Sequence, residues 1–411
     1  MNKKTKILLL IICLMAIVGI VLFLIFGLGS SDEFDPDDYK EPIELTKINF
    51  LTKKIEVYDD VKLSDVIELK NDLELLYDYQ INTDELGSTK LYIKYKENGE
   101  VYKNYTSIKI VDTTPPYIGV SGSYSHIVDT NFTFNSDVIC ADNYDKHVEC
   151  NIVGEYDLTT IGESNVKVVA EDSSGNITEK NMVLKVIEKP KASSGGGNTT
   201  VNYKKLEDII DKMPSDATLM IDVSKWQADI DWGKVKESGI NYAMIRIGSQ
   251  KAIDKESVLD TYFEKNIEEA QKNGIKVGVY YYSYANDVED AEEQAKWVLE
   301  QLKGYKLDLP VAFDWECWKY FNSFNISIHD LNVIAKTFLS KIEEAGYDTV
   351  NYGSKNYLET FWDLKGYKTW LAHYTDYTNY SKDFLMWQFT NIGTVPGING
   401  AVDVNYYYED N

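Results

Sequence analysis

Asp314 and Glu316 are two acidic side chains separated by one residue, and they follow a short apolar run in the C-terminal half of this 411-residue chain. If the run is a β-strand, both side chains point the same way and Trp315 points to the opposite face. Two carboxyl groups on one face suit hydrolysis of a glycosidic bond, in which one acid protonates the leaving oxygen and another stabilises the cationic sugar. The spacing alone is a weak signal, because the chain contains 66 acidic residues.

Other acids and several aromatic residues stand at comparable positions. Asp222 lies at the end of another apolar run, and Asp403 lies within the last one. Aromatic rings with a polar tip match the flat apolar faces of sugars, and those at the run ends are Tyr280, Tyr282, Tyr284, Tyr352, Trp370, Tyr374 and Trp387. A Cys/His nucleophile pair is not expected, because Cys317 stands alone and the chain has four histidines. The acids and aromatics together predict a glycosidase.

The apolar runs are the elements that must position these side chains. We predict eight strands, at Thr218–Val223, Tyr242–Ile247, Lys276–Tyr282, Pro310–Asp314, Thr349–Tyr352, Lys368–Ala372, Phe384–Phe389 and Ala401–Asn405. Amphipathic stretches between them predict helices, clearest at Leu259–Lys272, Glu289–Leu302 and Asp330–Glu344. Strands that alternate with helices predict an α/β fold, a modified TIM-like (β/α) barrel with parallel strands and a simplified last third. Active sites of such barrels lie at the C-terminal strand ends.

The order of the motifs in this region resembles the glycoside hydrolase family 25 lysozymes. The matching segments are Met220–Gln227, Ala243–Arg246, Gly278–Tyr280, Asp314–Glu316, Trp370–Tyr374, Trp387–Phe389 and Gly397–Asn405. The resemblance implies an N-acetylmuramidase that needs no cofactor or metal and cleaves the β-1,4 bond between N-acetylmuramic acid and N-acetylglucosamine in peptidoglycan.

The resemblance also implies roles for individual residues. Glu316 is similar to the general acid, and Asp314 to its partner, which is a base, a nucleophile or the group that orients the substrate N-acetyl. Asp222 and Asp403 resemble two further acids of the cleft, and repulsion from these carboxylates is expected to raise the pKa of Glu316. The implied substrate contacts are Arg246, Tyr280, Tyr282, Tyr352, Tyr374, Trp387 and Gln388.

Arg246 is the one arginine among 42 basic residues. We expect it to pair with a cleft carboxylate such as Asp222 or Asp314, or else to form a plain salt bridge of the barrel. A chain with a single arginine cannot build a multi-arginine phosphate clamp. The net charge of -24 argues against a nucleic-acid partner, because such binding requires a basic patch.

Residues 1–30 have the pattern of a membrane anchor. Ile7 to Leu28 carry no charge, are overwhelmingly apolar and are long enough to span a bilayer. Lysines precede this segment and acids follow it, which predicts a cytoplasmic N-terminus in a bacterial cell membrane and an external catalytic domain. A cleaved signal peptide is the alternative.

After an acidic linker at 31–47, the chain alternates like two small all-β sandwich modules, at 48–111 and 112–188. Ser64–Ile67 recurs as Ser136–Ile139, and the joint at Asp112–Pro116 resembles those of bacterial immunoglobulin-like surface modules. Cys140 and Cys150 are a candidate disulfide in an oxidising exterior. Four aspartates of these modules either gather around calcium or are solvated turn residues: Asp112, Asp142, Asp145 and Asp172.

A Ser/Gly-rich linker at 189–214 precedes the barrel domain at 215–411. The whole pattern predicts a membrane-tethered lysozyme whose modules act as a spacer between the lipid surface and the peptidoglycan. A non-catalytic, glycan-binding surface scaffold is the first alternative. A related barrel that cleaves chitin or a glucan is the second.

Overall fold

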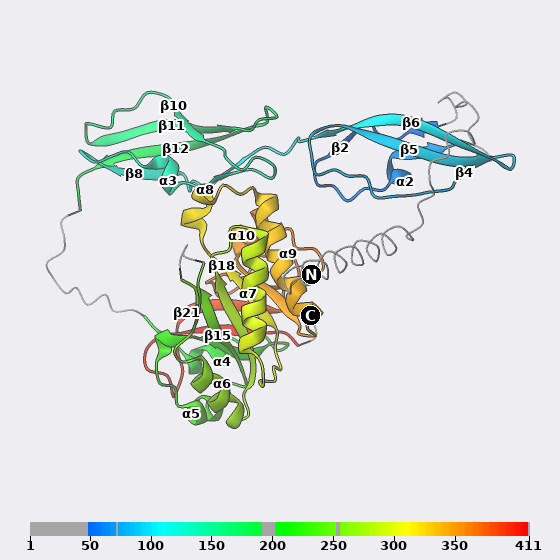
Figure 1. The fold of residues 1–411 in the computed structure, drawn as a ribbon. Helices are drawn as coiled ribbons and strands as arrows, with labels where there is room; N and C mark the ends of the chain where they lie inside the picture. Colours follow the sequence, from blue (N-terminus) through cyan, green and yellow to red (C-terminus); the bar gives the residue numbers. More distant parts are fainter. Residues whose placement is uncertain (1–47, 71–72, 191–201, 252–254, 410–411) are drawn as a thin grey trace, which may run out of the picture. The chain divides into compact units, whose positions relative to one another are not determined.

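The computed structural model describes residues 48–70, 73–190, 202–251 and 255–409. They form two compact units, one that ends at Asp112 and one that begins at Thr113 (Figure 1). The predicted anchor and acidic linker lie outside the described residues, as does the central part of the Ser/Gly-rich linker. Within the described ranges, no helix is both long and apolar enough to cross a membrane.

The first module contains a four-stranded sheet in the order β2-β6-β5-β4 and a separate strand pair, β1 with β3. Alternate residues of β5, such as Leu91, Ile93 and Tyr95, are buried, as expected for strands with one face on a core. The elements are β1 (Ile48–Phe50), β2 (Lys54–Glu56), α2 (Leu63–Val66), β3 (Ile67–Leu69), β4 (Glu74–Leu75), β5 (Gly87–Glu97) and β6 (Glu100–Val111).

The second module repeats this arrangement, with a sheet in the order β8-β12-β11-β10 and the pair β7 with β9. In both modules the first strand of the sheet runs parallel to its neighbour. Cys140 and Cys150 form a disulfide with a Cα–Cα distance of 5.9 Å. The elements are β7 (Tyr117–Ile118), β8 (Ser123–Ile127), α3 (Phe134–Asp137), β9 (Cys140–Ala141), β10 (Cys150–Val153), β11 (Gly162–Glu171) and β12 (Ile177–Ile187). The repeated sequence therefore folds into a repeated sheet order.

The C-terminal region is a closed barrel in which the last strand pairs with both β21 and the first strand. All eight predicted strands are present: β14 (Thr218–Val223), β15 (Tyr242–Gln250), β17 (Lys276–Ser283), β18 (Val311–Trp315), β19 (Thr349–Ser354), β20 (Lys368–Ala372), β21 (Met386–Thr394) and β22 (Val402–Tyr407). Two short strands, β13 (Lys204–Lys205) and β16 (Ser257–Leu259), pair with β21 and β15.

The last strand, β22, runs antiparallel to both of its neighbours, whereas every other neighbouring pair in the ring is parallel. The predicted all-parallel barrel is therefore wrong at this strand. The connection from β21 is too short for a parallel crossover, which needs a dozen or more residues. It turns through Gly397 and Gly400, whose φ angles of 95° and 99° favour glycine. As a result, β22 begins at the mouth where the other strands end.

Helices cover the outside of the barrel, and α7 and α9 lie side by side (Figure 1). The helices of this region are α4 (Leu206–Ile210), α5 (Trp232–Glu237), α6 (Phe263–Lys272), α7 (Val288–Gln301), α8 (Phe321–Phe324), α9 (Ile328–Glu344) and α10 (Lys355–Thr360). The predicted helix at Leu259 begins later, at Phe263, because Leu259 belongs to the strand β16. Ser327 caps α9 by accepting a hydrogen bond from Asp330 N, which fixes the start of that helix.

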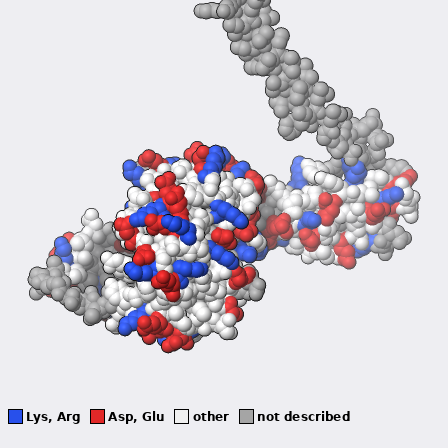
Figure 2. Space-filling model, turned by 90° about the horizontal axis from the view of Figure 1, so that it is seen from below, with Lys and Arg blue, Asp and Glu red and all other residues white. Residues whose placement is uncertain are grey.

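The second module and the barrel belong to the same compact unit. Asn322 of α8 donates hydrogen bonds to the carbonyl oxygens of Asn135 and Val138, at 3.0 and 2.9 Å. On the face drawn in Figure 2, lysines are interspersed with acidic residues, so this face presents no continuous basic patch.

Candidate active site

A cavity of about 260 Å³ opens at the carboxyl ends of the parallel barrel strands. It is lined by Asp222, Ser224, Trp226, Gln227, Arg246, Tyr280, Tyr282, Asp314, Glu316, Tyr352, Trp370, Tyr374, Gln388 and Asp403. The structure thus brings together the four predicted acids and every predicted contact residue except Trp387. Six of the 14 lining residues are aromatic and four are acidic, so the cavity suits a sugar.

Strand register explains why acids from distant parts of the sequence meet here. Asp222 on β14 and Asp403 on β22 are direct partners across the two strands. Asp314 on β18 is flanked by its register partners, Tyr282 on β17 and Tyr352 on β19. Asp403 reaches the mouth from the beginning of its strand only because β22 is antiparallel.

Asp222 is buried and held in one orientation by two amide groups. Its Oδ2 accepts hydrogen bonds from Gln388 Nε2 at 2.9 Å and from Asn405 Nδ2 at 2.8 Å. Burial raises the pKa of Asp222 to about 6, and the two hydrogen bonds oppose that rise. Near neutral pH this carboxyl is therefore mostly ionised, so it can present a fixed negative charge to the cleft.

Aromatic residues behind Asp222 fix the two amides in turn. Tyr352 and Tyr374 each donate a hydroxyl hydrogen bond to Gln388 Oε1 at 2.9 Å, and this leaves the Nε2 group to face Asp222. The indole of Trp370 donates to Asn405 Oδ1 at 2.8 Å in the same way. Tyr352 and Trp370 are buried, so they position the carboxylate, whereas Tyr374 is 52% exposed and can also contact a sugar.

Asp314 is a second buried acid of the cleft, as enclosed as Asp222. Its Oδ1 is buried and has no hydrogen-bond partner among the described residues, and its carboxyl shares a hydrogen bond with Glu316. Burial and then repulsion from Glu316 and Asp222 raise the pKa of Asp314 well above its ordinary value, while Arg246 opposes the rise. Asp314 therefore holds a proton readily and donates it toward Glu316.

Glu316 lies just beyond the end of β18, accessible to solvent from the cleft yet enclosed by its walls on most sides. Burial is the main cause that raises its pKa, and repulsion from Asp222 adds to it. The hydrogen bond from Asp314 lowers the pKa. Like-charge repulsion, the cause expected from the sequence, is thus secondary to burial.

Asp403 is partly buried, and burial followed by repulsion from Asp222 and Glu316 raises its pKa to about 8. An unfolded Asp ionises near its model value of 3.8. Between these values the folded chain keeps a proton that the unfolded chain has lost, so rising pH favours unfolding. This contribution to instability is absent at about pH 4 and complete above about pH 8.

We therefore expect Asp403→Asn to raise the melting temperature of the barrel at pH 8 by at least about 3 °C, and to leave it unchanged at pH 4. The measurement is thermal unfolding at both pH values. Asp383→Asn, at an exposed position outside the cleft lining, is the matched control and should have no effect at either pH. An equal shift at both pH values would contradict this origin of the effect.

Arg246 pairs with Asp260 rather than with the expected cleft carboxylates. Its Nε and a terminal nitrogen lie 2.8 and 2.6 Å from Asp260 Oδ2, and Asp260 also accepts a hydrogen bond from the backbone of Lys225. The alternative expectation, a salt bridge of the barrel, is therefore the one observed. The guanidinium nevertheless lines the cavity and lowers the pKa of Asp314.

Trp387 is the predicted contact residue that the structure places elsewhere. Its indole donates to the carbonyl of His373 at 2.8 Å, and its ring packs on Phe389 and Tyr406 in the core. Because neighbouring side chains of a strand point to opposite faces, Gln388 faces the cleft and Trp387 cannot. The prediction that both Trp387 and Gln388 contact the substrate was therefore wrong for Trp387, because two neighbouring residues of one strand cannot both face the cleft.

Four lining residues were not among the predicted contacts: Ser224, Trp226, Gln227 and Trp370. The first three follow β14 directly, where the loops of a barrel mouth must lie. Trp226 is 75% exposed at the cavity edge, where its ring can stack on a sugar, and Lys225 Nζ lies over the ring at 5.1 Å from its centroid. The position of Ser224, Trp226 and Gln227 just after a strand end was the sequence signal that could have predicted them as lining residues.

Sequence comparison identifies the family of this barrel. Residues 221–398 match the family model described as "Glycosyl hydrolases family 25". The chain carries a family 25 glycosyl hydrolase domain. It is accordingly a glycoside hydrolase of the lysozyme type. The two modules and the N-terminal segment lie outside the matched residues.

Known relatives match the family 25 domain over part of their lengths. The uncharacterized protein YegX of Escherichia coli strain K12 is 29% identical over 213 residues, which cover 50% of this chain and 75% of YegX. The autolytic lysozyme of Clostridium acetobutylicum is 26% identical over 192 residues, 46% of this chain and 55% of that protein. A solved family 25 glycosyl hydrolase from Bacillus anthracis has a TM-score of 0.42 and 22% identity, and the match covers 48% of this chain and 92% of that one.

Proposed function

We propose that the family 25 domain hydrolyses the β-1,4 bond between N-acetylmuramic acid and N-acetylglucosamine in peptidoglycan. The observation that carries the proposal is the hydrogen-bonded pair of Asp314 and Glu316 in a cleft with aromatic walls and two further acids. The autolytic lysozyme among the relatives supports the same substrate class.

Glu316 is the general acid in this proposal, because its carboxyl is the member of the pair that solvent and substrate can reach. Burial raises the pKa of Glu316, which favours the protonated form that a general acid needs, and the proton that it shares with Asp314 can pass to it for transfer to the leaving glycosidic oxygen. Asp222, fixed by Gln388 and Asn405, supplies a negative charge that stabilises the cationic sugar.

Glu316 protonates the leaving oxygen, and Asp314 assists the attack on the anomeric carbon. Asp314 is either the nucleophile itself or the group that orients the substrate N-acetyl group for attack. An inverting pair must be separated by about 6.5–9.5 Å to leave room for a water molecule. Asp314 and Glu316 share a hydrogen bond and leave no such room. We therefore infer that the reaction retains the anomeric configuration.

Digestion of purified peptidoglycan strands tests this function. We expect the full chain, purified in detergent, to release soluble fragments with new reducing ends, and proton NMR to detect the β anomer first. Binding without release of reducing ends would contradict hydrolysis and support the glycan-binding scaffold. Release of the α anomer first would contradict the inferred retention but would still support hydrolysis.

We further propose that residues 7–28 anchor the chain in the cell membrane with the family 25 domain outside. The support is the uncharged apolar segment, with lysines before it and acids after it. In this arrangement the modules hold the enzyme near the peptidoglycan above its own membrane. Protease added to intact cells should then digest the barrel, and protection of the barrel would contradict the orientation.

A further inference from the structure

The sheet of the first module carries a groove on its outer face. The groove has a volume of about 1160 Å³ and runs over the hairpin of β5 and β6. Its aromatic and charged lining residues form what we call the tyrosine–lysine face: Tyr77, Lys90, Tyr92, Lys94, Lys103 and Tyr105. All six belong to the compact unit that ends at Asp112, so the groove lies within one unit.

The three tyrosine rings of this face stand open to solvent. Tyr77, Tyr92 and Tyr105 are 62%, 54% and 51% exposed. Tyr92 and Tyr105 are register partners on β5 and β6, and their rings meet edge to face with 5.2 Å between centroids. The strand pairing thus holds two rings together as a surface on which a sugar can stack.

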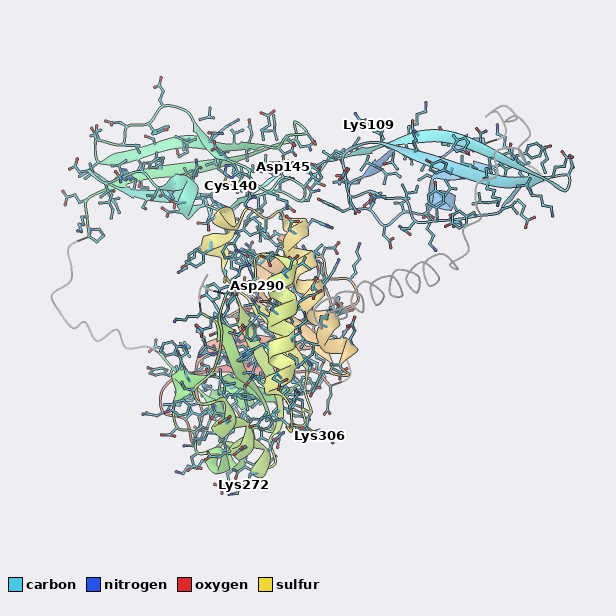
Figure 3. The ribbon with its side chains drawn as sticks, viewed as in Figure 1. Lys109, Cys140, Asp145, Lys272, Asp290 and Lys306 are labelled. Carbon is cyan, nitrogen blue, oxygen red and sulfur yellow. A yellow bond between two sulfur atoms is a disulfide. The ribbon has the colours of Figure 1, made fainter. Side chains whose placement is uncertain are left out.

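Lysines surround these rings. Lys90 and Lys94 lie on either side of Tyr92 along β5. Lys94 and Lys103 are direct register partners, a position in which like charges repel, so an anion bound there would lessen the repulsion. Lys109, labelled in Figure 3, continues the same side of β6 beyond the groove. None of the described residues that line the groove is acidic, although the net charge of the chain is -24.

The second module shows that the fold does not require such a face. Its hairpin of β11 and β12 takes the same place in the same sheet order. Counted from the glycine that begins each hairpin, Lys167 stands where the first module has Tyr92, and its register partner Asn181 replaces the second ring. Lys167 pairs with Glu179 at 2.7 Å, which balances its charge. The groove there is about 440 Å³, and its described lining includes no aromatic residue.

We propose that the tyrosine–lysine face binds a glycan strand of peptidoglycan. The rings stack on the apolar faces of successive sugars, and the lysines pair with carboxylates of the peptides that the strand carries. A phosphate polymer offers negative charge but no sugar face for the rings, so the observations favour the glycan. The inference rests on the proposed function for its ligand and adds a second contact with that polymer. Two contacts on one polymer raise the apparent affinity of the whole chain.

Sedimentation of the full chain with insoluble peptidoglycan, stripped of attached phosphate polymers, tests the proposal. Every chain carries Glu316→Gln, so that binding is measured with little cutting. We expect Tyr92→Ala combined with Tyr105→Ala to weaken binding at least about tenfold, because central aromatic residues carry much of the binding energy of an interface. Asn181→Ala, at the equivalent place in the second module, is the matched control and should bind unchanged. Equal binding by the tyrosine variant, or an equal loss in the control, would overturn the proposal.

A charge reversal separates loss of the ligand contact from loss of the fold. Lys90 is exposed and has other lysines nearby, so Lys90→Glu should leave the melting temperature of the module unchanged. It should nevertheless weaken binding several-fold at low salt, and added salt should reduce the difference from the wild type. Lys53→Glu, at an exposed position outside the groove lining, should change binding much less. Equal effects of the two reversals would overturn the proposal.

Two further measurements distinguish other outcomes. Tighter binding of a glycerol phosphate polymer than of peptidoglycan, or a dimer of the chain that the tyrosine variant abolishes, would overturn the proposed ligand. Cleavage of a short soluble peptidoglycan fragment by the wild-type chain reports on the cleft separately. Its absence would overturn the proposed hydrolysis and leave the binding result standing, whereas its presence without any effect of the tyrosine variant on binding would overturn the face alone.

Discussion

Glu316→Gln is expected to lower kcat on peptidoglycan by about 10²–10⁴-fold, the usual contribution of a general acid. The amide has the shape of the carboxyl but cannot donate a proton to the leaving oxygen. The measurement is the rate of reducing-end release across pH. The wild-type rate should fall at high pH as Glu316 loses its proton, and the residual rate of the variant should lack this fall.

A substrate that needs no protonation distinguishes loss of the acid from loss of the fold. An aryl glycoside with an acidic phenol leaving group should be cleaved by Glu316→Gln with a much smaller loss than peptidoglycan. Glu237→Gln, an exposed glutamate at the end of α5, is the matched control and should retain full activity. Equal losses on both substrates would show that Glu316 is not the acid.

Asp314→Asn is expected to lower kcat by about 10²–10³-fold, the size of effect seen when a preorganised electrostatic group is removed. The amide can still donate a hydrogen bond to Glu316, as the protonated Asp314 does. It cannot become an anion, however, and so can neither attack the sugar nor orient the N-acetyl group. We expect KM to change less than kcat, because the negative charge that is lost acts mainly in the transition state.

Stability and pH dependence test this assignment of Asp314. Since the substitution removes a buried ionisable group, the melting temperature at neutral pH should not fall. The residual activity should keep its fall at high pH, because Glu316 is still present to titrate. Asp348→Asn, an exposed aspartate just before β19, should behave like the wild type. Activity near the wild-type level in Asp314→Asn would remove it from the mechanism.

The strands of the barrel were predictable because each is an apolar run bounded by polar residues. Thr218–Val223 and Lys368–Ala372 have the predicted bounds in the structure. The direction of β22 was not predictable from such a run, because strand periodicity carries no information on direction. The short connection through Gly397 and Gly400 was the usable signal. Likewise, Leu259 fitted a helical apolar pattern but pairs with β15 through β16.

The acids of the cleft were predictable because strand ends in a barrel meet at one mouth. The partner of Arg246 was not, because any of 66 acids could have been chosen and Asp260 is brought near only by the β15–β16 pairing. The positioning roles of Tyr352 and Trp370 also depend on hydrogen bonds that form across the barrel. Such contacts follow from the fold and not from residue type or spacing.

Identification of the reducing-end sugar released from defined peptidoglycan tests the central claim most directly. The new reducing ends are reduced with borohydride, and the fragments are then hydrolysed to single sugars. The sugar that carries the reduced end is identified by its mass. The cleft chemistry and the family 25 domain predict reduced muramic acid from the wild-type chain, released about 10²–10⁴-fold more slowly by Glu316→Gln. Reduced glucosamine as the product would contradict the proposed cleavage site.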